Sequence, residues 1–425
     1  MKLNTKRTVF VGLAFMSICA FSQLYDGIIP LILKNTFHVG DTWSGVVMAL
    51  DNVFALFLLP LFGVFSDKVN SRFGRRTPFI VCGTAAAVIS MLLIPIADNT
   101  RSLPLFVVGL LIVLLSISTY RSPAVALMPD VTPKPLRSKG NAIINLMGAV
   151  GGMLTLLLIA ALVPKIGTPN YLPLFAVVAV IMAVSVIVLV MKVKERAIAD
   201  EVAAQEPDEA PELDAAGKPA PMEKAVKRSL LFLLFSVALW FMGYNAVTTA
   251  FSKYAQVYWG LKGGGFASCL LIATGAAILS YIPVGNIATK VGRKKTILFG
   301  VAVLGIAFVI GSFIRTFSPI VNLLFVFVGI AWAAINVNSY PMVVEMSRGS
   351  DVGKFTGFYY SFSMAAQIVT PILSGALLEH VGYGTLFPYA AIFVVLSFVT
   401  MLFVKHGDSK PVQPQSKLEA FNVED

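Results

Sequence analysis

Long apolar segments recur along the whole chain, and they constrain its fold more than any other feature. Each is long enough to cross ~30 Å of hydrocarbon as a helix, which takes about 20 residues. Only helices and closed barrels can span a bilayer, and these segments lack the alternating pattern of a barrel strand. We predict an all-α membrane protein with twelve transmembrane helices, at 8–33, 44–66, 78–98, 103–128, 139–163, 172–194, 229–257, 264–288, 295–315, 319–343, 355–378 and 384–405.

The overall composition agrees with a membrane protein. Hydrophobic residues make up 57% of the chain and charged residues only 13%, against about 25% charged residues in an average soluble domain. The net charge of +11 would suggest nucleic acid in a soluble protein, but the charge falls in loops, so we expect no nucleic-acid partner. The three cysteines lie in different apolar segments without metal-ligand spacing. We expect no metal site, no disulfide and no cofactor.

The segment 195–228 divides the chain in two. It is rich in Ala, Pro, Glu and Asp and has almost no large apolar residue, which is typical of a solvated linker. We predict an N-terminal six-helix bundle (1–194), this linker, a C-terminal six-helix bundle (229–405) and a cytoplasmic tail (406–425).

The two halves repeat each other. Gly74 and Gly292 follow the second and eighth spans, and Pro123 and Pro341 lie in the fourth and tenth. Both pairs are separated by 218 residues, which favours a duplication. We therefore expect two pseudo-symmetric bundles with a binding site near the midplane between them.

The distribution of basic residues predicts the orientation. If the N-terminus lies inside, 26 of the 33 Lys and Arg residues fall in cytoplasmic segments. Both termini are therefore expected to be cytoplasmic, in a multi-pass monomer of the plasma membrane. The first apolar segment is too long for a signal peptide and has no obvious cleavage site, so we interpret it as a retained span.

A charged motif closes the second span. It reads Gly63-x-x-x-Asp67, then Arg72-x-Gly74-Arg75-Arg76. An Asp at a helix end beside arginines can make charge-assisted contacts to neighbouring helix ends. The loop resembles the loop-two signature of the major facilitator superfamily, and such a cluster could hold one conformation and release in another. The predicted gate or latch residues are Gly63, Asp67, Arg72, Arg75, Arg76, Asp130 and Glu345. The alternative is that the arginines only enforce the topology.

Two further stretches narrow the resemblance. Residues 71–80 (SRFGRRTPFI) and 120–142, which includes Tyr120-Arg121-Ser122-Pro123, are similar to sucrose/proton symporters of the glycoside–pentoside–hexuronide cation symporters. The resemblance implies proton-coupled uptake of a sugar or glycoside. The chain departs from the family at its ion sites. Leu110 stands where plant sucrose carriers have an acid, and Ala55 and Leu59 stand where melibiose-type sodium carriers have acids.

Acidic residues within spans are costly and are functional candidates by default. Asp26 and Asp51 both lie roughly 10 Å below the outer surface by helical rise, so they could share a cavity. A carboxyl group in a low-dielectric cavity can exchange a proton near neutral pH. We predict both as proton-coupling residues, with Asp26 the better candidate. Alternatively, they form hydrogen bonds that pin helices together.

Arg121 is the other charged residue deep within a span. Helical rise puts it ~15 Å deeper than the two acids, so a salt bridge to Asp26 is not expected. Its expected neighbours are Asn141 and Asn145, which share one helix face. A guanidinium with two amides suits a hydroxyl-rich ligand or a carboxylate. The alternative is that Arg121 bonds backbone carbonyls and Asp130.

The C-terminal half supplies amides and aromatic rings at mid-span depth. Sugars need this mixture, although aromatic residues at helical spacing also serve as packing. The predicted substrate-binding residues of both halves are Tyr25, Arg121, Asn141, Asn145, Asn245, Trp332, Asn336, Tyr359 and Gln367. Lys253 lies near the outer end of its span, where we expect its amine to reach water.

The leading hypothesis is a proton-coupled sugar or glycoside symporter that works by alternating access. The sequence contains no phosphate loop, HExxH or nucleophile elbow in a plausible context, so an enzyme is not expected. Two alternatives stay open. One is an exporter or carrier of organic anions or lipids, and the other is a membrane receptor that binds ligand without transport.

Overall fold

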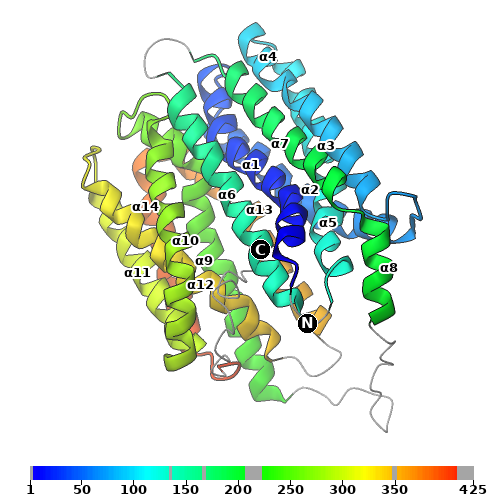
Figure 1. Ribbon diagram of the computed structural model, residues 1–425. Helices are drawn as coiled ribbons and strands as arrows, with labels where there is room; N and C mark the ends of the chain where they lie inside the picture. The colour runs from blue at the N-terminus through cyan, green and yellow to red at the C-terminus, as the bar shows by residue number, and fades with distance from the viewer. Residues whose placement is uncertain (1–2, 134–135, 165–168, 206–222, 347–351, 409–425) are drawn as a thin grey trace.

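The computed structural model describes residues 3–133, 136–164, 169–205, 223–346 and 352–408, and these residues are overwhelmingly helical (Figure 1). Within these ranges twelve helical spans are long and apolar enough to cross a membrane. The predicted fold class is therefore confirmed.

Each half of the molecule is formed by one continuous part of the chain. The first half contains α1 (Thr5–Asn35), α2 (Asp41–Lys68), α3 (Thr77–Met91), α4 (Leu93–Thr100), α5 (Leu103–Asp130), α6 (Arg137–Leu162) and α7 (Leu172–Lys192), and is followed by α8 (Glu195–Gln205). The second half contains α9 (Lys224–Val257), α10 (Gly265–Val291), α11 (Arg293–Phe313), α12 (Val321–Val344), α13 (Val352–His380), η3 (Tyr383–Thr385) and α14 (Leu386–Leu402).

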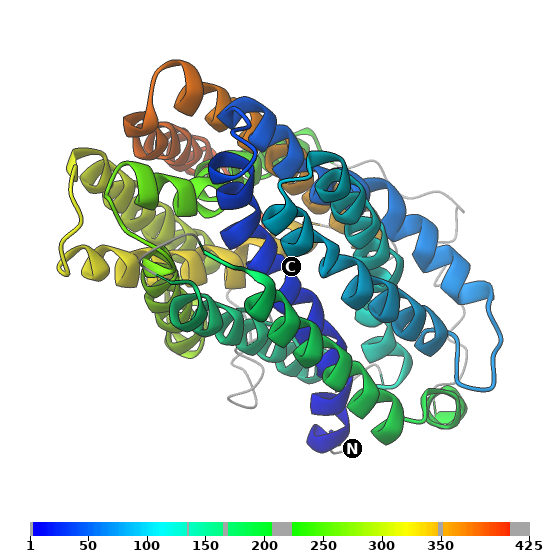
Figure 2. The same ribbon diagram turned by 90° about the horizontal axis from the view of Figure 1, so that it is seen from above.

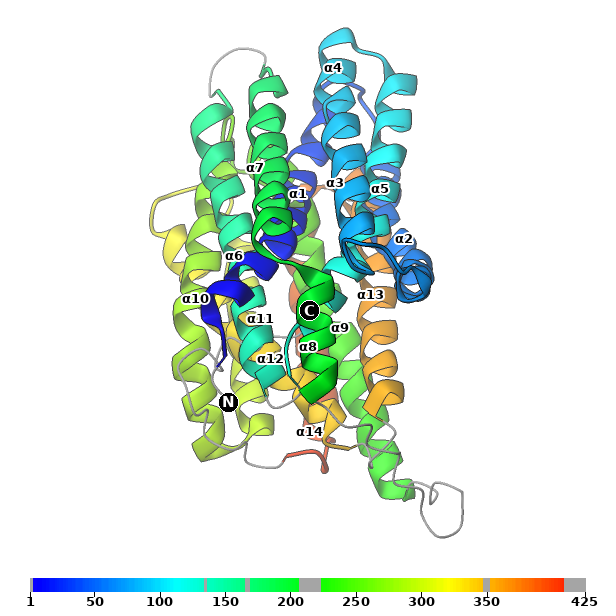
Figure 3. The ribbon, with the colours of Figure 1, turned by 45° about the vertical axis from the view of Figure 1, so that its right-hand side comes forward.

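The third span is broken into two helices, α3 and α4, at Leu92. Pro95 explains the break, because it has no N–H to donate and its ring clashes with the carbonyl of Met91. The sequence pattern predicts one continuous span here, since both pieces are apolar. Figure 3 shows α4 projecting farthest at the outer end of the first half.

The two halves repeat the same helix packing. In the first half α1 packs on α6 and α7, and α3 packs on α5. The equivalent pairs in the second half are α9 on α13 and α14, and α11 on α12. Between the halves, α2 packs on α13 and α10 on α6, which are again equivalent pairs. The predicted pseudo-symmetric bundles are confirmed, and Figure 2 shows them side by side.

Contacts between the halves gather at the ends of the helices that are expected to face outward. The Asn35 side chain donates to Gln256 at 3.0 Å, and the backbone N–H of Thr42 donates to Glu379 at 2.8 Å. The backbones of α2 and α13 approach so closely that a Cβ on Gly45 would lie 2.0 Å from the carbonyl oxygen of Pro371. These contacts close the expected outer side of the molecule.

The segment predicted as a solvated linker is partly structured. Its first residues form α8, which extends from the end of α7 (Figure 1), and its last residues belong to α9. Glu195 and Val202 are buried in α8, so the prediction of a wholly solvated segment is wrong at its first end. At the other end, residues 224–228 are helical but largely exposed. Residues 206–222, and 409–425 of the predicted tail, lie outside the described residues.

Candidate transport site

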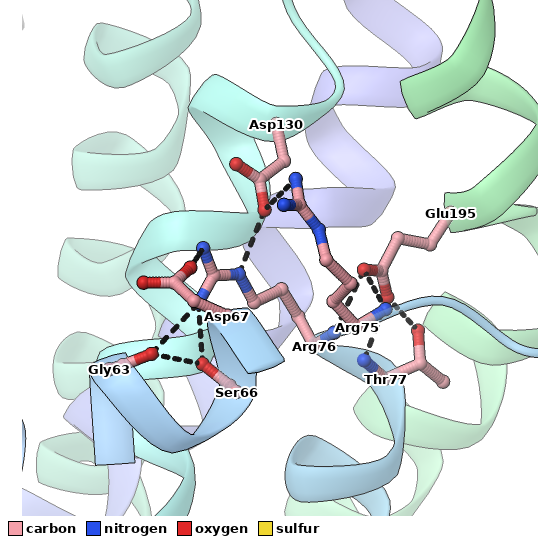
Figure 4. Close-up of polar contacts among 8 residues, drawn as sticks. All are labelled: Gly63, Ser66, Asp67, Arg75, Arg76, Thr77, Asp130 and Glu195. Atoms are coloured by element: carbon pink, nitrogen blue, oxygen red, sulfur yellow. Dashed lines mark hydrogen bonds and ion pairs between the residues drawn. The ribbon is translucent and has the colours of Figure 1, made fainter. Parts of the chain in front are cut away.

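Arg76 is the centre of the charged cluster at the expected cytoplasmic side (Figure 4). It precedes α3, and its guanidinium reaches across to the ends of α2 and α5. Its Nε donates to Asp130 at 2.8 Å, and its two terminal nitrogens donate to Asp67 and Ser66. The carbonyl of Gly63 also accepts from it, at 3.4 Å. Arg76 thus fastens three helix ends together with one planar group.

The charges of the cluster balance locally. Burial alone would lower the pKa of Arg76, but the hydrogen bond to Asp130 and the charges of Asp130 and Asp67 raise it overall. Arg75 lies 3.7 Å from Asp130 and is half exposed. Arg72 lies apart, over the ring of Phe73 at 4.6 Å. The structure therefore brings together five of the predicted latch residues, Gly63, Asp67, Arg75, Arg76 and Asp130, all in the first half.

Glu195 completes this cluster, and sequence reasoning missed it. Its carboxylate accepts from the backbone N–H groups of Arg75 (2.6 Å), Arg76 (2.8 Å) and Thr77 (2.7 Å), and from the Thr77 hydroxyl (2.7 Å). These N–H groups have no partner within the helix. A carboxylate at a helix N-terminus also interacts favourably with the positive end of the helix dipole. Gly74 makes room with φ of 114°, because a Cβ there would lie 2.2 Å from the carboxyl carbon of Glu195.

The second half carries a reduced copy of this arrangement. Gly292 has φ of 97°, and Arg293 forms an ion pair with Glu345. The backbone N–H of Lys294 donates to Asp408 at 2.8 Å. In each half, an acid that follows the last span caps the first turn of the third span. Glu345, a predicted latch residue, lies in this second cluster.

Asp51 and Arg121 form an ion pair inside the membrane span, with 3.7 Å between Oδ2 and Nη1. The predicted depth difference between Arg121 and the acids is therefore wrong for Asp51. Two features explain the error. Helix α2 begins at Asp41, earlier than predicted, and α5 begins beside the projecting helix α4 (Figure 3). The alternative partner for Arg121, Asp130, is bound by Arg76 instead.

Asp26 belongs to the same charged group. It is half-buried and close enough to Asp51 and Arg121 to interact electrostatically with both. Within the described part of the chain it forms no ion pair. The hydroxyl of Tyr25, a predicted substrate ligand, donates instead to the carbonyl of Val47 at 2.7 Å. That hydroxyl thus connects α1 to α2.

Two of the predicted amides have unused hydrogen-bonding capacity. Nδ2 of Asn145 and Oδ1 of Asn245 are buried without a partner among the described residues. A buried amide without a partner is costly unless something else satisfies it. Asn141 and Gln367 are half-buried, and Asn336 is buried at 6% exposure.

The aromatic residues fall into two groups. The rings of Tyr244 and Trp332 stack at 3.6 Å with an interplanar angle of 6°, and Phe241 packs edge-on against Trp332. Tyr359, by contrast, is 2% exposed and its hydroxyl lies 3.0 Å from that of Ser339. The structure therefore places Tyr359 in the packed interior, whereas Trp332 is only half-buried.

A buried ion pair joins the halves at the expected outer side. Nζ of Lys253 lies 2.8 Å from Asp41 and 3.1 Å from the hydroxyl of Ser44, and the Tyr383 hydroxyl donates to Asp41 at 2.7 Å. Lys253 is 3% exposed, so the expectation that its amine reaches water is wrong. Helix α2 packs over it. In the sequence, Asp41 has the appearance of an ordinary acid at a helix start.

One protein-family model and several known proteins are similar to this chain. The model of the Major Facilitator Superfamily matches residues 11–281 and 265–423. Sucrose transport protein SUC4 of Arabidopsis thaliana is 32% identical over 131 residues, which are 27% of this chain and 26% of that protein. SUC3 of the same plant is 26% identical over 138 residues, 28% of this chain and 23% of that protein. The matches thus span about a quarter of these relatives.

Other matches extend the comparison. Human proton-associated sugar transporter A is 30% identical over 135 residues, 29% of this chain and 18% of that protein. Among solved structures, the nucleoside transporter NupG superposes with a TM-score of 0.68 at 13% identity, covering 95% of this chain and all of that one. A bacterial homologue of the iron transporter ferroportin, in an inward-facing state, gives 0.66 at 12% identity, covering 94% and 99%. At these identities the likeness shows the fold alone.

Proposed function

Because this chain belongs to the major facilitator superfamily of membrane transporters, we propose that it carries a sugar or glycoside together with protons by alternating access. The relatives that match part of the chain are sucrose transporters and a proton-associated sugar transporter. The proposal places the protein in the plasma membrane with both termini in the cytoplasm, as the distribution of basic residues indicates.

The observation that carries the proposal is the charged group of Asp26, Asp51 and Arg121 inside the first half. Asp51 is paired with Arg121, whereas Asp26 forms no ion pair with a described residue. A carboxyl group of this kind can bind a proton when the site opens to one side and release it at the other. Asp26 is thus the proposed proton carrier, and the Asp51–Arg121 pair holds the site around it.

The proposed sugar site uses the unsatisfied amides and the aromatic surface. Asn145 and Asn245 offer a donor and an acceptor for hydroxyl groups. The stacked rings of Tyr244 and Trp332 offer an apolar face for the C–H surface of a sugar. The rival function, transport of organic anions, would be favoured by an Arg121 whose charge no acid offsets. Its ion pair with Asp51 offsets that charge.

Transport in proteoliposomes tests the proposal. Purified protein should accumulate a labelled sugar, with sucrose and an α-glucoside as first candidates, when the outside is made acidic. Asp26→Asn should lose accumulation driven by the pH gradient but keep exchange of labelled for unlabelled sugar, because exchange needs no net proton movement. Glu223→Gln, an exposed acid before α9, is the matched control and should behave like the wild type.

Two results would count against the proposal. Full gradient-driven accumulation by Asp26→Asn would show that Asp26 does not carry the coupled proton. No accumulation and no exchange with any sugar, while an organic anion is carried, would favour the rival function.

A further inference from the structure

A pocket of about 360 Å³ lies between the loop after α2, the end of α7 and helix α8. It is separate from the charged group inside the membrane span. Three basic side chains line its polar wall, those of Arg72, Lys194 and Arg196, together with Thr77 and Asp200. These come from two segments far apart in the sequence, which Glu195 holds together through its bonds to residues 75–77.

The positive charge of the pocket is largely unbalanced. Asp200 is the single acid that lines it, against three cations. The ion pairs between described residues do not involve Arg72, Lys194 or Arg196. All three side chains are exposed. Their donors are therefore available to an anion.

The rest of the pocket is apolar and lies where two spans end. Val190 and Val193 line it at the end of α7, and Phe73 lines it from the loop. Phe73 is 53% exposed beneath the guanidinium of Arg72. Helix α3 begins at Thr77, so the pocket sits at the level where the chain leaves the hydrocarbon. A small soluble anion would leave the apolar wall without a contact. A phospholipid has both a charged head for the basic residues and an apolar body for that wall.

We propose that this pocket binds the phosphate headgroup of an anionic phospholipid of the cytoplasmic leaflet. The two arginines can donate to the phosphate oxygens, and Lys194 adds a third charge. The apolar wall receives the glycerol and the upper part of the acyl chains. Basic pockets at the cytoplasmic side of a membrane are a recurrent type of binding site for anionic lipid headgroups.

Thermal unfolding of the full-length protein in detergent tests this site. Added dioleoyl phosphatidylglycerol should raise the unfolding midpoint in a saturable way, because a ligand that binds only the folded state stabilises it. Phosphatidylcholine with the same acyl chains, and glycerol 3-phosphate alone, should have little effect. The triple variant Arg72→Gln, Lys194→Gln, Arg196→Gln should bind the anionic lipid at least about tenfold more weakly.

The control removes the same charge from the cytoplasmic side of the other half. Lys224→Gln, Lys227→Gln, Lys405→Gln changes three exposed lysines and should leave lipid binding unchanged. If the pocket triple variant does not fold, the double variant Lys194→Gln, Arg196→Gln should still bind more weakly than wild type.

Three outcomes would overturn the proposal. One is equal lipid affinity of the pocket variant and the wild type. Another is equal stabilisation by phosphatidylcholine, which would show no selection for an anionic head. The third is equal stabilisation by glycerol 3-phosphate, which would identify a soluble phosphate compound as the occupant.

Discussion

Arg76 shows how much one side chain can organise in this fold. It is 6% exposed, and it donates to two carboxylates, a hydroxyl and a carbonyl from the ends of α2 and α5. A buried cation is stable only where its charge and its donors are matched. The planar guanidinium supplies five donors on three nitrogens in a fixed fork, whereas lysine has three donors on a single nitrogen.

Arg76→Gln should therefore lower the free energy of unfolding by about 2 to 3 kcal/mol, since Asp67 and Asp130 lose their shared cation. The stability of Arg76→Lys should lie between those of the wild type and Arg76→Gln, because lysine keeps the charge but not the fork of donors. Thermal unfolding in detergent would measure the order of the three proteins. Arg72→Gln, in the same loop but outside the cluster, should be close to wild type without lipid. An equally large loss for Arg72→Gln would mean that the loop needs charge rather than this geometry.

The sequence predicts this cluster better than it predicts the membrane site. Gly63, Asp67, Arg75 and Arg76 stand close together along the chain, so their spacing alone indicates a shared role. Asp51 and Arg121 belong to different helices, and residue counts measure depth only from the start of each helix. Their pairing depends on how far each helix projects, which helical rise cannot supply. The ion pair of Lys253 could not be predicted for the same reason, because its partner Asp41 belongs to the other half.

At the scale of helices, the third span of each half is capped at its start by an acid, and the two caps differ in strength. Glu195 accepts three backbone N–H groups and is 2% exposed. Asp408 accepts one, from Lys294, and is exposed. Both caps depend on the chain returning from the last span of a half to the start of its third span. Sequence reasoning found the duplicated glycines but missed these acids, since each is followed by more polar residues and has the pattern of a solvated segment.

Glu195→Ala should destabilise the protein by about 1 to 2 kcal/mol, because the N-terminal N–H groups of α3 lose a charged acceptor. Asp408→Ala should cost clearly less, since it removes a single exposed contact. Hydrogen exchange measured by mass spectrometry should show faster exchange of the amides at residues 75–77 in Glu195→Ala and no change there in Asp408→Ala. Equal exchange at 75–77 in both variants would contradict the assigned cap.

At the scale of the whole molecule, the two bundles meet at the outer side through a buried ion pair. Lys253 belongs to α9 of the second half, and Asp41 begins α2 of the first. Gly45, one turn farther along α2, allows the backbone of α13 to approach. If this transporter works by alternating access, the outer side must open, and the Lys253–Asp41 pair must then separate. Its contribution is present only in the outer-closed state.

Lys253→Met should therefore shift the protein toward the outer-open state. Methionine keeps much of the length of lysine but removes the nearer of the two cations that pair with Asp41, which retains Lys34 at 3.6 Å. The cost in the outer-closed state is therefore below the roughly 3 to 5 kcal/mol expected when a buried charge loses its whole compensation. A bias of even 1.4 kcal/mol changes the ratio of two states about tenfold. Spin labels on Leu103→Cys and Ile320→Cys, exposed outer positions in opposite halves, should report a longer distance, after exposed Cys82 is replaced by serine. Lys262→Met removes an exposed cation from the same half and should leave the distance distribution unchanged. An unchanged distribution in Lys253→Met as well would show that the ion pair does not hold the outer side closed.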